Sequence, residues 1–157
     1  MKWITRAHVH VDRVACPWLI RRFIDAEAEF SFVAKALLEE ETKRIGAIPF
    51  DAPDVELGHH GEDCSFVSII KKYELRDPAL LMLAEVVNAA DTGRLEANPY
   101  AAGLEAIAQG FSLMRPDDFE NLEAQFMVYD ALYAFLKLEA AKSHAKAGAP
   151  GSKPLSA

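Results

Sequence analysis

The chain lacks the features that mark membrane and secreted proteins. No apolar run in its 157 residues approaches the roughly 20 residues that a membrane-spanning helix needs. Met1 leads into residues 2–6 (KWITR), which contain neither the apolar core nor the cleavage site of a signal peptide. With only two cysteines, Cys16 and Cys64, a disulfide-dense scaffold is excluded. We expect free thiols in a reducing cytoplasm, although two cysteines can also pair.

Positive charge is also scarce. Lys and Arg total 17 against 24 for Asp and Glu, which gives a net charge of -7 and argues against nucleic-acid binding. The hydrophobic share of 51% is that of an ordinary globular domain with a full core. Residues 143–157 (SHAKAGAPGSKPLSA) contain almost no large apolar side chain, so we expect a disordered tail. The sequence therefore predicts one domain over residues 1–142.

The first third of the chain alternates between strand-like and helix-like segments. Residues 2–5, 29–33 and 47–50 are predicted to be extended, the last because a residue before proline avoids the helical region. Residues 17–24 and 34–45 are predicted to be helical, since Pro suits a first helical turn and Gly46 suits a helix end. This β-α-β-α-β unit favours parallel strands.

The rest of the chain is predicted to be helical. Apolar side chains recur at three- and four-residue spacing, and proline stands near several helix starts. The expected helices cover residues 65–73, 78–90, 99–110 and 116–142. The fold class is α+β and predominantly helical.

Residues 56–65 (ELGHHGEDCS) bring imidazole, carboxylate and thiol side chains together in one glycine-flanked loop. His59, Glu62 and Cys64 are residue types that bind transition metals, and a flexible loop can bring them together. The spacing matches no strict metal-binding signature. A polar loop that caps the helix starting at Ser65 explains the same residues.

Residues 11–23 (VDRVACPWLIRRF) embed charged groups and a thiol in apolar surroundings. If a helix starts at Pro17, then Asp12, Arg13 and Cys16 lie in the turn before it, where the helix dipole favours anions. An exposed Cys16 would then have a lowered pKa. Arg13 suits bidentate binding of an oxyanion, but salt bridges to nearby carboxylates explain it equally well.

Two further positions carry charge where packing alone would not require it. Asp91 and Arg94 fall in an ADTGR segment at a helix end. Asp130 interrupts the apolar face of the longest helix, so we expect it to be mostly buried and paired. A structural pair with Arg13 or Arg94 and a catalytic role are both open for Asp130.

These four stretches together resemble the C-terminal domain of bacterial chromate-resistance proteins. The resemblance runs in order from about Trp3 to Phe135. It rests on the segments WITR…VDRVACPWLIRRFID, GAIPFD…VELGHHGEDCSF, ADTGRL and MVYDALYAF. Longer members carry an N-terminal region that is associated with regulation, so we interpret this chain as a stand-alone version. Of the adjacent histidines, only His59 lies in the motif.

The resemblance implies that the motifs converge on one pocket. Our first hypothesis is a metal-dependent small-molecule enzyme or metal-binding domain that takes Mn, Fe or Zn. The expected metal ligands are His59, Glu62, Asp91 and Asp130, and Asp12 is a further candidate. Catalytic roles for an anionic substrate or oxyanion are expected for Arg13, Arg94 and Cys16.

The alternative hypothesis is a chromate- or oxyanion-binding redox sensor without catalysis. The dianion would be bound by Arg13, Arg21, Arg22 and Arg94, and Cys16 or Cys64 would report its redox state. A purely structural or dimerising domain is the third hypothesis, and a homodimer is compatible with all three. None of these requires a nucleic acid or a membrane.

Overall fold

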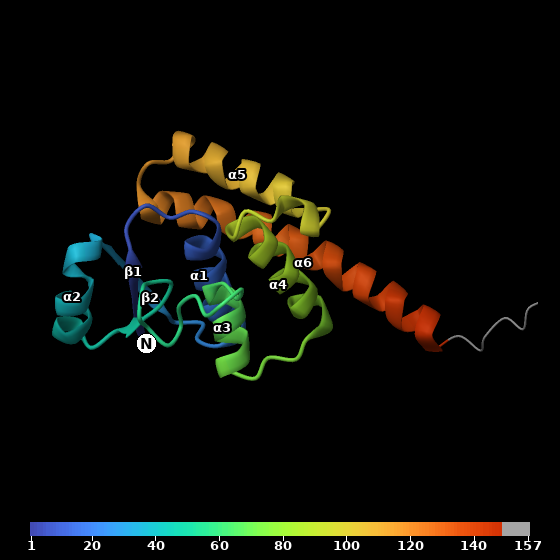
Figure 1. Cartoon of the computed structure of the whole chain (residues 1–157), viewed down its shortest axis with the longest axis horizontal. Helices are drawn as coiled ribbons and strands as arrows, with labels where there is room; N and C mark the ends of the chain where they lie inside the picture. The colour runs from blue at the N-terminus through green and yellow to red at the C-terminus, as the bar shows by residue number, and fades with distance from the viewer. Residues whose placement is uncertain (149–157) are drawn as a thin grey trace, which may run out of the picture.

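A small parallel sheet lies at one end of a mostly helical molecule. The computed structural model describes residues 1–148, and the sheet order is β2-β1-β3 (Figure 1). The strands are β1 (Lys2–Arg6), β2 (Glu29–Val33) and β3 (Ile48–Pro49). β1 pairs in parallel with both neighbours, with Trp3 opposite Phe30 and Ile48. The predicted α+β class with its N-terminal β-α-β-α-β unit is confirmed.

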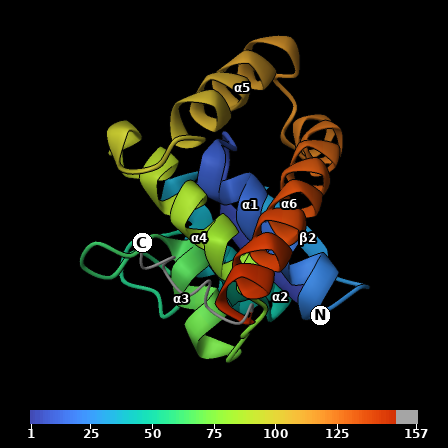
Figure 2. The same ribbon diagram turned by 90° about the vertical axis from the view of Figure 1, so that its right-hand side faces the viewer.

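Helix α1 (Val11–Phe23) is the centre of the core. Nine of its thirteen residues are buried, and α3, α4 and α6 pack around it (Figure 2). The indole of Trp18 is fully buried and meets the rings of Phe23 and Tyr133 edge-on, each at 5.7 Å between centroids. This packing explains the apolar half of the 11–23 stretch.

The predicted start of this helix at Pro17 is wrong. The helix begins at Val11, so Pro17 lies inside it. Proline costs one backbone hydrogen bond there. The buried side chains of Val11, Val14 and Ala15 lie in the turns before Pro17, and their burial outweighs that loss. Tertiary packing has overridden a local signal.

The remaining helices complete the fold, and α2 packs against β1 instead of α1. A 3-10 turn (Lys35–Leu37) precedes α2, whose predicted end at Gly46 is confirmed by a left-handed φ of 64°. Helix α4 starts as predicted, because Asp77 accepts a hydrogen bond from the Leu80 N–H at 3.0 Å and Pro78 is the first helical residue. The helices are α2 (Leu38–Ile45), α3 (Ser65–Lys72), α4 (Pro78–Asp91), α5 (Ala101–Met114) and α6 (Asp118–Gly148), with a 3-10 turn at Leu95–Ala97.

Helix α6 continues farther than predicted. The sequence placed its end at Lys142 and a disordered tail at residues 143–157, but residues 143–148 are helical. Ala and Lys make up half of this segment and are strong helix formers, so it needs little burial to continue the helix. The end of α6 projects from the body in Figure 1. The rest of the predicted tail, residues 149–157, lies outside the described residues. Within residues 1–148, no helix is both long and apolar enough to cross a membrane.

Candidate metal centre

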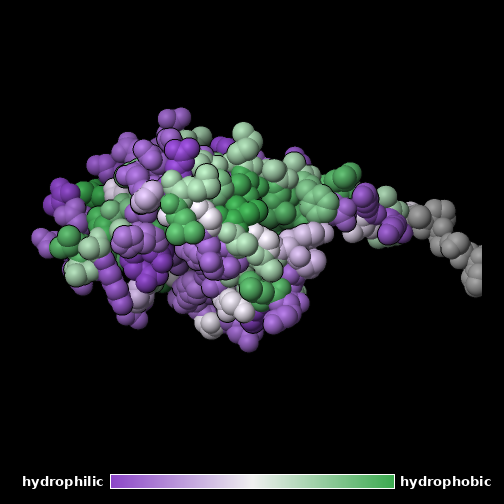
Figure 3. Space-filling model, turned by 90° about the horizontal axis from the view of Figure 1, so that it is seen from above, coloured by the Kyte–Doolittle hydropathy of each residue, from purple (hydrophilic) through white to green (hydrophobic). Residues whose placement is uncertain are grey.

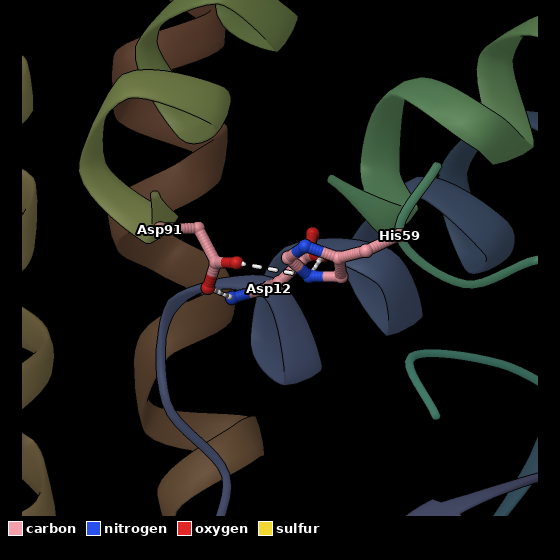
Figure 4. Close-up of side chains that lie close together, drawn as sticks. All are labelled: Asp12, His59 and Asp91. Carbon is pink, nitrogen blue, oxygen red and sulfur yellow. Dashed lines mark hydrogen bonds and ion pairs between the residues drawn. The ribbon is translucent and has the colours of Figure 1, made fainter. Parts of the chain in front are cut away.

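Three carboxylates surround one imidazole at the carboxyl edge of the sheet. The Nε2 atom of His59 lies 3.4 Å from Asp12 Oδ2, 3.4 Å from Asp51 Oδ1 and 3.2 Å from Asp91 Oδ2. Figure 4 shows Asp12, His59 and Asp91 converging from α1, the loop before α3 and the end of α4. One donor atom from each of these three lies within 4.8 Å of the others.

The parallel sheet explains why Asp12 and Asp51 meet. Asp51 follows β3 after one residue, and Asp12 is the second residue of the helix that follows β1. The carboxyl ends of parallel strands lie at the same edge of a sheet, where ligands of open α/β sheets bind. Asp51 adopts a left-handed φ of 43°, a conformation that costs energy for a residue other than glycine.

Asp12 is fixed by the N-terminus of α3. Its carboxylate accepts hydrogen bonds from the backbone N–H of Ser65 at 2.7 Å and of Phe66 at 3.1 Å. The Cys16 thiol donates a third, at 3.3 Å. Free N–H groups and the positive end of a helix dipole stabilise a negative charge, so Asp12 can stay buried at 1% exposure.

Asp51 is held by Arg13, which the sequence predicted to act on an anionic substrate. Arg13 Nε lies 3.0 Å from Asp51 Oδ2, and Arg13 Nη1 donates to the carbonyl of Ala7 at 2.7 Å. Ser65 Oγ donates to Asp51 Oδ1 at 3.0 Å. Burial and the neighbouring Asp12 charge raise the pKa of Asp51, and Arg13 partly offsets them. In this structure Arg13 therefore positions a carboxylate.

The electrostatics of the cluster favour a cation at its centre. Burial, followed by the charges of Asp12 and Asp51, raises the pKa of Asp91 to about 7. The contact with Asp12 raises the pKa of His59 to about 9, and burial opposes this rise. Several carboxylates that share one site repel each other unless a positive charge lies between them. A protonated His59 supplies that charge here, and a metal ion would supply it more strongly.

Asn88 and Arg94 attach the His59 loop to α4. The side-chain carbonyl of Asn88 accepts from the Cys64 N–H at 2.8 Å, and its amide donates to the carbonyl of Glu62 at 3.1 Å. Arg94 Nη2 donates to the same carbonyl at 3.3 Å, and its Nε donates to Thr92 at 3.1 Å. These bonds hold the loop that carries His59 beside the helix that carries Asp91.

The sequence predicted Glu62 as a metal ligand, but its side chain does not join the cluster. Its side chain is 89% exposed and lies 3.7 Å from Arg94 Nη1, in an ion pair at the surface. Glu62 contributes through its backbone carbonyl, which is the acceptor for Asn88 and Arg94. The loop turns at Gly61, which has a left-handed φ of 62°.

Asp130 also lies apart from the group formed by Asp12, His59 and Asp91. It accepts two hydrogen bonds from Arg22, both at 2.9 Å, and one from the Trp18 indole at 2.8 Å. An arginine pairs with Asp130 as predicted, but it is Arg22 and neither Arg13 nor Arg94. Asp130 was expected to be mostly buried, and its burial is intermediate, with 35% of the side chain exposed. Arg22 lowers the pKa of Asp130, which is the behaviour of a structural ion pair.

Both cysteines are buried free thiols. A helix start at Pro17 would have left Cys16 exposed with a lowered pKa, and this expectation is wrong. Cys16 lies inside α1 with no exposed surface, and burial raises the pKa of its thiol well above the usual value, helped by Asp12. Burial likewise raises the pKa of Cys64. Neither thiol is placed for catalysis at neutral pH.

Sequence reasoning missed one member of the cluster. His59 and Asp91 were predicted as ligands and Asp12 as a further candidate, and these three come together. Asp51 was not singled out, although it directly follows the predicted extended segment at residues 47–50. A carboxylate at the end of a parallel strand is the signal that could have identified it.

Fold and site together define a small, mostly helical α+β domain with a His/carboxylate cluster at its sheet edge. The chain belongs to the family described as "ChrB, C-terminal domain", which matches residues 3–136. This match confirms the resemblance carried by the four motifs.

A curated relative supports the same assignment. Over 135 residues the chain is 34% identical to Protein ChrB of Cupriavidus metallidurans. The match covers 84% of this chain and 40% of that protein, so the chain corresponds to less than half of its relative. No solved structure matches the chain.

Proposed function

We propose that this domain binds one divalent metal ion through Asp12, His59 and Asp91, and that the ion takes part in the chemistry of a small anionic molecule. The observation that carries the proposal is the convergence of three carboxylates on the Nε2 atom of His59. Two of the three carboxylates are almost completely buried. Buried carboxylates at such distances are costly without a cation.

The donor set limits which metals fit. One imidazole with two or three carboxylates suits Mn, Fe or Zn, and the absence of a thiolate donor disfavours softer ions. Asp51 lies outside the group of three whose donor atoms are within 4.8 Å of one another, and Arg13 and Ser65 engage its oxygens. We therefore assign Asp51 to charge balance around the three ligands.

The proposed centre leaves room for a substrate. The His59 side chain is 44% exposed, so one side of the cluster opens to solvent. A metal with three protein ligands keeps open positions, where it can polarise a bound oxygen or activate water. Arg94 lies three residues beyond Asp91, and its Glu62 partner is exposed, so an anion could replace this weak ion pair.

The redox-sensor hypothesis has less support. It needs a reactive thiol, whereas both cysteines are buried and have raised pKa values. Anion binding through Arg13 would also have to displace it from Asp51, and anion binding through Arg22 would have to displace it from Asp130. No contact among the described residues favours this alternative over a metal centre.

Metal titration of two matched variants tests the proposal. Mn²⁺ and Zn²⁺ are titrated calorimetrically into chelator-treated wild type, His59→Ala and His60→Ala. His60 is the adjacent histidine and contacts the carbonyl of Glu56 instead of the cluster. We expect binding to one site in wild type and His60→Ala, and its loss in His59→Ala. Equal binding by all three proteins, or none by the wild type, would contradict the proposal.

A further inference from the structure

An apolar seam runs along α5 and α6. Eight of the eleven large hydrophobic side chains that are exposed in the described chain belong to this helix pair and its flanks. They are Tyr100, Ile107, Leu113, Met114, Phe119, Met127, Phe135 and Leu138. Figure 3, which views the molecule from above Figure 1, shows hydrophobic surface gathered over this layer. We call this surface the α5/α6 seam.

The seam contains both a hollow and projecting side chains. A groove of about 290 Å³ lies between the helices, and Gly103, Ile107 and Leu132 are among its lining residues. The rings of Tyr100 and Phe135 meet edge-on at 5.4 Å at one end. Space is open above Gly103, so the helix surface is recessed beside the projecting Ile107. A surface with hollows and projections side by side can be complementary to itself.

The middle of the seam is also nearly free of charge. Helix α5 carries a single charged residue, Glu105, whose carboxylate lies 3.5 Å from His10. Residues 124–136 of α6 likewise carry one, Asp130, which is occupied by Arg22. Charged residues make up 26% of the whole chain. The lack of charge is therefore local, as in the centre of a protein interface.

We propose that the α5/α6 seam is where two copies of this chain associate. Phe119 also contacts Phe32 of β2, and without it the exposed fractions of the other seven side chains amount to roughly 800 Å² if each offers about 200 Å². A standard interface buries about 800 Å² per partner, whereas the largest apolar patch on a typical monomer is about 300–600 Å². The seam is thus as large as one half of a dimer interface.

Charge favours a second copy over a partner of opposite charge. Each copy carries a net charge of -7, so two copies repel each other on most approaches. An uncharged seam is the face on which that repulsion is smallest. Two-fold pairing of this helix pair would form a four-helix arrangement, in which Ile107 of each copy can enter the groove of the other.

The experiment measures mass in solution. Wild type, Ile107→Glu, Met127→Glu and Leu37→Glu are compared by sedimentation equilibrium across micromolar concentrations. Leu37 is the control because it is 50% exposed, close to the 42% of Ile107, but lies outside the seam. We expect wild type and Leu37→Glu to have twice the chain mass of 17.3 kDa, and both seam variants to be monomeric.

Folding of the variants is checked by thermal melts. Met127 is 72% exposed, so a charge there does not disturb the core, and it provides a second test if Ile107→Glu loses stability. A monomeric wild type overturns the proposal and leaves the seam to a different partner. A dimer that survives both seam substitutions also overturns it, because the interface must then lie elsewhere.

Discussion

Replacing Asp91 by asparagine should stabilise the metal-free protein while removing metal binding. The carboxylate of Asp91 has a pKa of about 7 instead of 3.8, because of burial and the charges of Asp12 and Asp51. At 1.36 kcal/mol per pKa unit, keeping it ionised costs about 4 kcal/mol. Asparagine avoids this cost and can still accept the Asp12 N–H, which now donates to Asp91 Oδ1 at 3.2 Å.

The gain should depend on pH with a definite sign. Since the folded state holds the Asp91 proton more tightly than the unfolded state, this group lowers stability progressively as the pH rises from about 4 to about 7. Above that range the loss is constant. The pKa of about 7 already includes the attraction between Asp91 and protonated His59, so we expect a net gain of up to about 4 kcal/mol near pH 8. This is up to about 8–16 °C in Tm for a chain of this size.

The assay is denaturant unfolding of chelator-treated protein near pH 5 and near pH 8. Asp117→Asn is the control, because Asp117 is exposed and its oxygen accepts from the Glu120 N–H at 3.0 Å. The control should change stability little at either pH. Addition of Mn²⁺ should raise the Tm of the wild type and the control but not that of Asp91→Asn. A variant that is less stable than wild type at both pH values would refute the reasoning, because Asp91 would then be an anchor of the fold.

Four further outcomes follow from individual contacts. Asp12→Asn should cost about 1–3 kcal/mol in denaturant unfolding, because an amide cannot accept at both positions where backbone N–H groups point. Cys16 should react with iodoacetamide, followed by mass spectrometry, only when denaturant is present. Asn88→Ala should lower Mn²⁺ affinity in calorimetry by about 10–100-fold, since it releases the loop that carries a ligand. Asp130→Ala should cost about 1 kcal/mol of stability, because its pair with Arg22 is half-exposed. Chemical unfolding should show that this cost disappears as the pH falls below the ordinary range of Asp pKa values.

The fold was largely predictable because its signals are local. The Asp77-Pro78 helix start and the Gly46 helix end depend on the residues next to them, and both appear where the sequence placed them. The start of α1 was mispredicted because it depends on contacts with distant elements. Pro17 favoured a later start, but the burial of Val11 in the core decided the outcome. Local rules fail where tertiary packing outweighs them.

The site was only partly predictable for a related reason. A motif residue can take part in the chemistry of the site or hold the fold, and the sequence alone does not separate these two roles. Glu62 has the residue type of a ligand but acts through its backbone carbonyl, and Arg13 suits an oxyanion but binds Asp51. The role of each became clear only when its partner was known, and every such partner comes from a distant part of the chain.

Asp12 shows why geometry decides between such roles. Asp12 is a helical residue in an apolar stretch, and the sequence alone suggests that it forms a salt bridge. Yet its carboxylate binds the N–H groups that begin α3, and its own N–H binds Asp91 at the end of α4. One residue thus joins three helices at the point where His59 enters. A carboxylate needs no such convergence to cap a helix, but a metal centre requires its ligands to be held together before the ion arrives.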